Sequence, residues 1–95
     1  MTTTTTTRFA RGRILATPGA LKVMQAAGQS PLRLVKRHAH GDWGAVHPFD
    51  ADANELALRQ ELRLLSVCIL STDERVWVIT EADRSATTIL LPEEY

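Results

Sequence analysis

The feature that most constrains this chain is a change in the spacing of its apolar residues near Leu64. From there to Leu70 the side chains alternate with a period of two, which is typical of a β-strand. Two further β-rich segments follow, residues 75–81 and 86–91, and only short polar turns separate the three. Because connections this short join antiparallel neighbours, the C-terminal part is predicted to be a three-stranded antiparallel meander.

Helical signals dominate the chain before this point. A Thr-Pro pair at residues 17–18 and a glycine at position 28 are typical of a helix start and a helix end, so a first helix is predicted over 18–27. A Ser-Pro pair at residues 30–31 predicts a second helix that ends at Gly41.

A third helix is predicted to begin at a capping box, in which Asp52 caps the helix and Glu55 reaches back to it. An apolar stripe at helical spacing follows, made of Leu58, Leu62 and Leu65. The short apolar segment at residues 12–16 is a candidate edge strand. Together these elements predict an α+β fold, with two to three N-terminal helices packed on the three-stranded meander and the early strand added at one edge.

The chain length of 95 residues fits one domain and leaves no room for two. Six threonines follow Met1, and this low-complexity start predicts a disordered leader over residues 1–10, with a single α+β domain over residues 11–95. There is no secretory signal pattern and no apolar run near the ~20 residues that span a bilayer, so no membrane partner is expected. The single cysteine, Cys68, excludes an internal disulfide, and a cytoplasmic location is expected.

The formal net charge of zero hides an uneven distribution. Residues 1–49 carry seven basic groups and one acidic group, whereas residues 50–95 carry four basic and ten acidic groups, which gives formal charges of +6 and −6. This asymmetry permits a basic face for a nucleic acid or an acidic partner, and it equally permits the two halves to neutralise each other on folding. Arg8, Arg11 and Arg13 are likewise compatible with a nucleic-acid arm or with a solubilising tail.

The first candidate site is the segment Arg37–Gly44, which with His47 gathers all three histidines and one acid. His38 could act as a general acid or base that Asp42 orients. A metal site is the weaker alternative, because the usual zinc spacings are missing. The structural interpretation is that the histidines cap a helix end and that Trp43 fills the edge of the core.

The second candidate site is the polar turn over residues 80–88. Arg84 offers a bidentate fork for a phosphate or carboxylate, Thr87 and Thr88 offer hydroxyl groups, and Glu81 offers a base. The structural interpretation is a hairpin in which Asp83 bonds its own backbone and Arg84 is merely exposed. A third segment, residues 90–95, is either a docking motif or a frayed chain end.

Several segments together resemble a family of small bacterial proteins carried on plasmids, integrative elements and phages. These segments are residues 37–44, 54–58, 63–66, 76–88 and 91–95. Family members are named plasmid-related proteins or, by automatic naming, type I restriction endonuclease subunit M. Glu61 and Cys68 depart from the family pattern, which often has Gly and Tyr there. A methyltransferase needs a doubly wound sheet and a catalytic motif with adjacent prolines. The sequence shows neither feature, so the resemblance implies at most an association with restriction or defence loci.

Two functions from different classes follow from these observations. The first is a non-catalytic accessory or binding protein of mobile genetic elements, which contacts a protein or a nucleic acid. Its candidate binding residues are His38, Asp42, Trp43, Asp83, Arg84, Thr87 and Thr88. The alternative is a small ribonuclease-like enzyme that acts on RNA phosphodiesters through His38, Glu81, Arg84 and Thr87. No cofactor is expected in either case, since phosphate loops, dinucleotide fingerprints and nucleophile elbows do not occur in the sequence.

Overall fold

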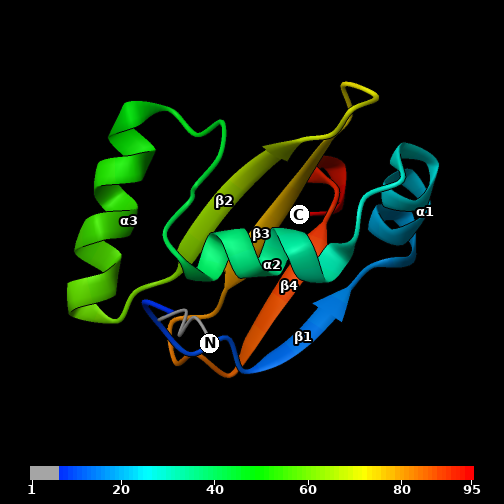
Figure 1. Ribbon diagram of the computed structural model, residues 1–95. Helices are drawn as coiled ribbons and strands as arrows, with labels where there is room; N and C mark the ends of the chain where they lie inside the picture. Colours follow the sequence, from blue (N-terminus) through cyan, green and yellow to red (C-terminus); the bar gives the residue numbers. More distant parts are fainter. Residues whose placement is uncertain (1–6) are drawn as a thin grey trace, which may run out of the picture.

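Four strands form one mixed sheet in the order β1-β4-β3-β2 in this computed structural model, which describes residues 7–95 (Figure 1). The strands are β1 (Arg13–Ala16), β2 (Leu64–Ile69), β3 (Arg75–Thr80) and β4 (Ala86–Leu90). β2, β3 and β4 form the expected antiparallel meander, and β1 adds to its edge by pairing in parallel with β4. The prediction of an α+β fold with an added edge strand is therefore confirmed.

Three helices precede the meander and a short 3-10 helix follows it. They are α1 (Pro18–Ala27), α2 (Pro31–Ala39), α3 (Pro48–Gln60) and η1 (Pro92–Glu94). α1 has the predicted bounds, with the Thr17 hydroxyl accepting a hydrogen bond from the backbone N–H of Ala20 and Gly28 in the left-handed conformation. α2 begins as predicted, but the side chain of Ser30 makes no capping hydrogen bond.

The predicted start of the third helix is wrong. α3 begins four residues before Asp52, because Pro48 occupies its first position and the side chain of His47 accepts a hydrogen bond from the N–H of Phe49. The helix ends after Gln60, where Glu61 adopts a φ of 53°. Leu62 and Leu65 therefore lie beyond the helix and do not extend its apolar stripe.

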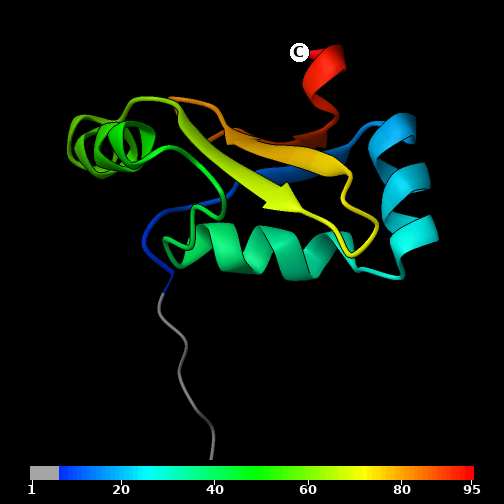
Figure 2. The ribbon, with the colours of Figure 1, turned by 90° about the horizontal axis from the view of Figure 1, so that it is seen from above.

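α1 and α2 cover one face of the sheet, whereas α3 lies beside the β2 edge and η1 lies on the opposite face (Figure 2). The main core fills the space between the first two helices and the sheet. Its largest fully buried apolar side chains are Met24, Leu34, Val35, Val76, Val78 and Ile89. A second cluster of Trp43, Ala57 and Leu64 joins α3 to the sheet edge. Within residues 7–95, no helix has the length and apolar character needed to cross a bilayer.

The N-terminal segment makes tertiary contacts from Arg8 onward. The N–H of Arg8 donates to the carbonyl of Ala39, and its guanidinium forms a bidentate ion pair with Glu55. Gly12 lies so close to the turn between β3 and β4 that a Cβ atom at this position would be 2.3 Å from the backbone of Ser85. Residues 1–6 of the expected leader lie outside the described residues.

Candidate functional site

His38 lies at the centre of a buried chain of hydroxyl groups. Its Nε2 atom is 2.9 Å from the hydroxyl of Thr80, which is 2.7 Å from the hydroxyl of Thr87, and Thr87 donates to the carbonyl of Arg11. Because the Thr87 proton goes to that carbonyl, Thr80 donates to Thr87 and accepts from His38. The proton of the imidazole is therefore on Nε2, and Nδ1 accepts a hydrogen bond from Ser66.

The buried position of His38 determines its charge. Burial, together with the positive charge of Arg84, lowers the pKa of His38 from 6.5 to about 4. The imidazole is thus neutral near pH 7. Both His38 and Thr87 are fully buried, so neither side chain has access to solvent. These two groups join α2 to β3 and β4 through the Thr80 hydroxyl, and neither faces an open surface.

Arg84, a predicted phosphate or carboxylate ligand, instead binds backbone carbonyl groups of its own chain. Its guanidinium donates to the carbonyls of Leu62 and Ala57, at 2.6 and 3.1 Å, and so ties the end of α3 to the turn between β3 and β4. Asp83 accepts a hydrogen bond from the N–H of Ser85, as the structural interpretation of this turn expected. Thr88 is half-buried on the sheet face opposite to Thr87, since neighbouring residues of a strand point to opposite faces.

Trp43 belongs to an aromatic cluster with His38 and Phe9. The indole is buried and stacks on the ring of Phe9 at a centroid distance of 6.2 Å, and it meets the imidazole edge-on at 5.6 Å. Its N–H donates to the carboxylate of Glu55, which also holds Arg8. Phe9 was given no role from the sequence, where its only signal is an aromatic residue that directly follows the threonines and Arg8.

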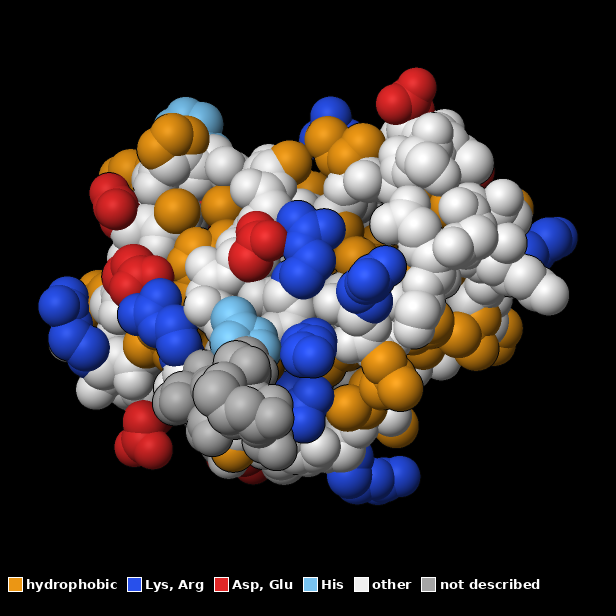
Figure 3. Space-filling model, in the orientation of Figure 1, with side chains coloured by type: hydrophobic (Ala, Val, Ile, Leu, Met, Phe, Trp, Pro, Cys, Tyr) orange, Lys and Arg blue, Asp and Glu red, His pale blue; other side chains and the backbone are white. Residues whose placement is uncertain are grey.

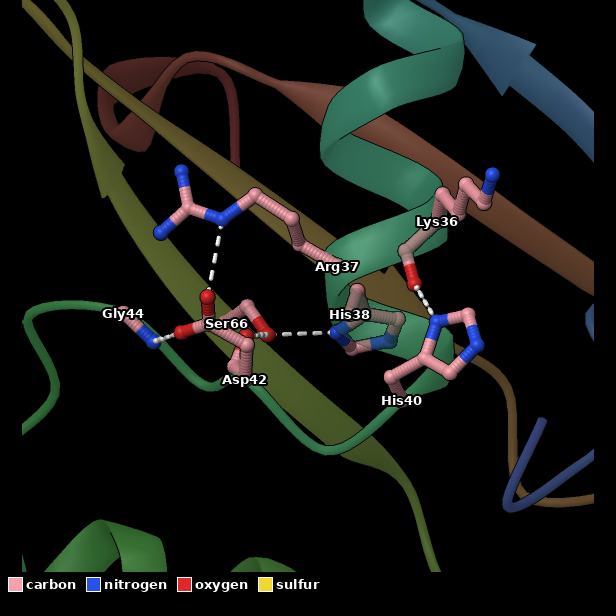
Figure 4. A network of polar contacts seen from close by, with 7 residues as sticks. All are labelled: Lys36, Arg37, His38, His40, Asp42, Gly44 and Ser66. Atoms are coloured by element: carbon pink, nitrogen blue, oxygen red, sulfur yellow. Dashed lines mark hydrogen bonds and ion pairs between the residues drawn. The ribbon is translucent and has the colours of Figure 1, made fainter. Parts of the chain in front are cut away.

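Asp42 points outward and does not orient the imidazole (Figure 4). Its carboxylate accepts from the Nε atom of Arg37 at 2.8 Å and from the N–H of Gly44 at 3.1 Å. The hydrogen bond from Arg37 is the main reason why the pKa of Asp42 lies below its ordinary value. This pair forms one wall of an open surface hollow.

The hollow has a volume of about 470 Å³ and lies over the outer face of α2. We call it the basic hollow, and its lining residues are Arg33, Lys36, Arg37, His40 and Asp42. Lys and Arg side chains gather over this part of the surface (Figure 3). Among residues 7–95, Arg33 and Lys36 form no ion pair. The hollow therefore offers two cations that the described part of the protein does not neutralise.

His40 adds a further polar group at the rim of the basic hollow. Its Nδ1 atom lies 2.6 Å from the carbonyl of Lys36 and donates to it (Figure 4). The Nε2 atom is buried and has no hydrogen-bond partner within residues 7–95.

The predicted site residues separate into an interior group and a surface group. His38, Trp43, Thr87 and Arg84 converge inside the protein rather than around an open cleft, while Asp42 lies at the surface. Sequence reasoning did not identify the basic hollow, although residues 33, 36, 37 and 40 share the i, i+3, i+4, i+7 spacing of one helix face.

Within residues 7–95, no group of three or more His, Cys, Asp and Glu side chains is placed to hold a metal ion.

Comparison of the chain with protein-family models, curated proteins and solved structures found no match.

Proposed function

We propose that this chain is a non-catalytic binding protein that contacts the phosphate backbone of a nucleic acid through the basic hollow. The observation that carries the proposal is the shared helix face of Arg33, Lys36, Arg37 and His40, which lines an open hollow with only one carboxylate. We further propose that it serves as an accessory factor of mobile genetic elements, with a link to restriction or defence loci. This second part rests on the sequence resemblance alone.

The charges of the basic hollow favour a polyanion. Asp42 neutralises Arg37, so Arg33 and Lys36 supply the net positive charge. Guanidinium and ammonium groups are the usual partners of phosphate oxygens, and each phosphate contact displaces counterions from the nucleic acid. Because the chain as a whole has a formal net charge of zero, attraction to a nucleic acid must come from a local basic patch such as this hollow, and it should be sensitive to salt.

The interior position of the predicted catalytic groups favours binding over catalysis. His38 and Thr87 are fully buried, and the guanidinium of Arg84 donates to backbone carbonyls. A general acid or base must come within hydrogen-bonding distance of its substrate, which a buried neutral imidazole does not do in this fold. The ribonuclease alternative thus gains no support from these residues.

The test is fluorescence anisotropy with labelled duplex DNA and labelled RNA over a series of NaCl concentrations. We expect Arg33→Ala combined with Lys36→Ala to weaken binding by about tenfold or more, and to reduce the salt slope by about two because two phosphate contacts are lost. The matched control is Lys22→Ala combined with Arg75→Ala, which removes two exposed cations outside the hollow. The control should bind as the wild type does.

Three results would contradict the proposal. One is wild-type protein that binds neither nucleic acid at low salt. Another is equal loss of binding in the hollow variant and in the control variant. The third is competition by polyglutamate that matches competition by unlabelled DNA, which would point to an acidic protein partner. RNA recovered intact after the incubation would separate binding from cleavage.

A further inference from the structure

α3 carries an apolar stripe that faces away from the rest of the protein. The buried side of the helix is formed by Asn54 and Ala57, which contact the sheet edge. On the opposite side Phe49 is 76% exposed and Leu56 is 41% exposed, with Ala53 exposed between them. These three residues follow the i, i+4, i+7 spacing of one helix face. Figure 3 shows hydrophobic side chains at the surface over this helix.

The stripe is shaped and charged in a way that suits a copy of itself. Phe49, Ala53, Leu56 and Asp52 line an open hollow of about 270 Å³. Asp52 and Arg59 lie seven residues apart, which places them on the same face and on either side of Leu56. Neither forms an ion pair among residues 7–95. The stripe therefore has an acid towards its start, an apolar middle and a base towards its end.

An antiparallel arrangement of two such helices satisfies both charges at once. The first turn of one α3 then lies against the last turn of the other, so that Asp52 of each copy faces Arg59 of the other copy. The two-fold symmetry makes this contact twice, and the apolar side chains between the two pairs are shielded from water. The opposed helix dipoles also favour this direction over a parallel one.

We propose that a second copy of this chain docks antiparallel along the outer stripe of α3 to form a two-fold dimer. The proposal is independent of the proposed function, because the basic hollow belongs to α2. A helix of 13 residues is about 20 Å long, so one helix pair buries less than the ~800 Å² per partner of a standard interface. The dimer is therefore weak, with a dissociation constant in the micromolar range or above.

Sedimentation equilibrium of the full chain from about 1 μM to about 1 mM tests this proposal. We expect the average mass to rise from that of one chain towards that of two over this range. Leu56→Glu should remain monomeric throughout, because it places a charge in the middle of the stripe. The matched control is Leu32→Glu, which changes an exposed leucine on α2 and should leave the association unchanged.

Charge exchange identifies the pairing direction. Asp52→Arg alone and Arg59→Asp alone should each weaken self-association, since like charges then face each other twice. A mixture of these two variants should associate again as a heterodimer, and the chain that carries both changes should recover the homodimer. Circular dichroism confirms that each variant is folded.

Wild-type protein that stays monomeric to about 1 mM overturns the proposal. Association that persists in folded Leu56→Glu also overturns it, and so does a mixture of the two charge variants that remains monomeric. Loss of nucleic-acid binding in the variants of the basic hollow does not bear on the dimer, so the two proposals fail separately.

Discussion

Replacement of Thr80 by valine tests whether the buried hydroxyl chain stabilises the fold. Valine keeps nearly the same shape, so packing is maintained and only the hydroxyl group is lost. The N–H of His38 then loses its acceptor at 2.9 Å, and Thr87 loses the donor at 2.7 Å. An unsatisfied buried donor costs about 1–3 kcal/mol, whereas Thr87 keeps its bond to the carbonyl of Arg11 and adds less.

We therefore expect Thr80→Val to lower the free energy of unfolding by about 2–3 kcal/mol, a large part of the ~5–10 kcal/mol typical of a small domain. Urea unfolding followed by tryptophan fluorescence measures this change. The matched control is Thr88→Val on the opposite sheet face, which should change the unfolding free energy by no more than about 0.5 kcal/mol. In a His38→Leu background the cost of Thr80→Val should shrink, because the imidazole donor is already gone.

The reasoning fails if Thr80→Val unfolds within about 0.5 kcal/mol of the wild type at an unchanged denaturant slope. It also fails if the cost is the same in the presence and absence of the imidazole. Either result would mean that the hydroxyl chain does not act as a connected network.

Two further predictions concern pH and backbone geometry. The pKa of His38 falls from 6.5 in the unfolded chain to about 4 in the folded protein, so below pH 6.5 protons bind preferentially to the unfolded chain. Stability should then fall as the pH is lowered from 6.5 to 4, by about 3 kcal/mol in urea titrations, and the fall should be smaller in His38→Gln. Gly12→Ala combines a φ of +62° with a Cβ 2.3 Å from a backbone atom, and it should cost more than about 2 kcal/mol in the same assay. Gly28→Ala has a φ of +69° but open space around the new Cβ, so it should cost only about 1 kcal/mol, and equal costs would show that the close approach at Gly12 is unimportant.

Local signals in the sequence were sufficient for the first helix and for the meander. The Thr17-Pro18 start and the Gly28 end of α1 depend only on neighbouring residues, and the alternation after Leu64 depends only on which side chains face the core. The start of α3 was missed because two capping signals compete there. His47-Pro48 prevails over Asp52, since proline at the first helical position sets the backbone angle in advance.

The candidate site was harder to predict because its partners are distant in the sequence. Leu34, Val35 and His38 share the buried face of α2, and helical spacing alone places the imidazole on the apolar side. In contrast, Thr80 lies 42 residues from His38, and their contact depends on how the helix docks on the sheet. The same applies to Phe9, whose stacking on Trp43 requires the N-terminal segment to cross the end of the sheet.

The pairing of β1 with β4 has a consequence for the order in which the chain is synthesised. Arg13 is paired with Ala86, so β1 has no strand partner until β4 has been made. Until then the apolar faces of α1 and α2 can be covered only by the β2–β3 hairpin, without the core side chain of Ile89. The four-stranded sheet is therefore completed only after residues 86–90 have been made. Before β4 is added, the core between the helices and the sheet is incomplete, and chaperones or other chains can reach its exposed apolar side chains.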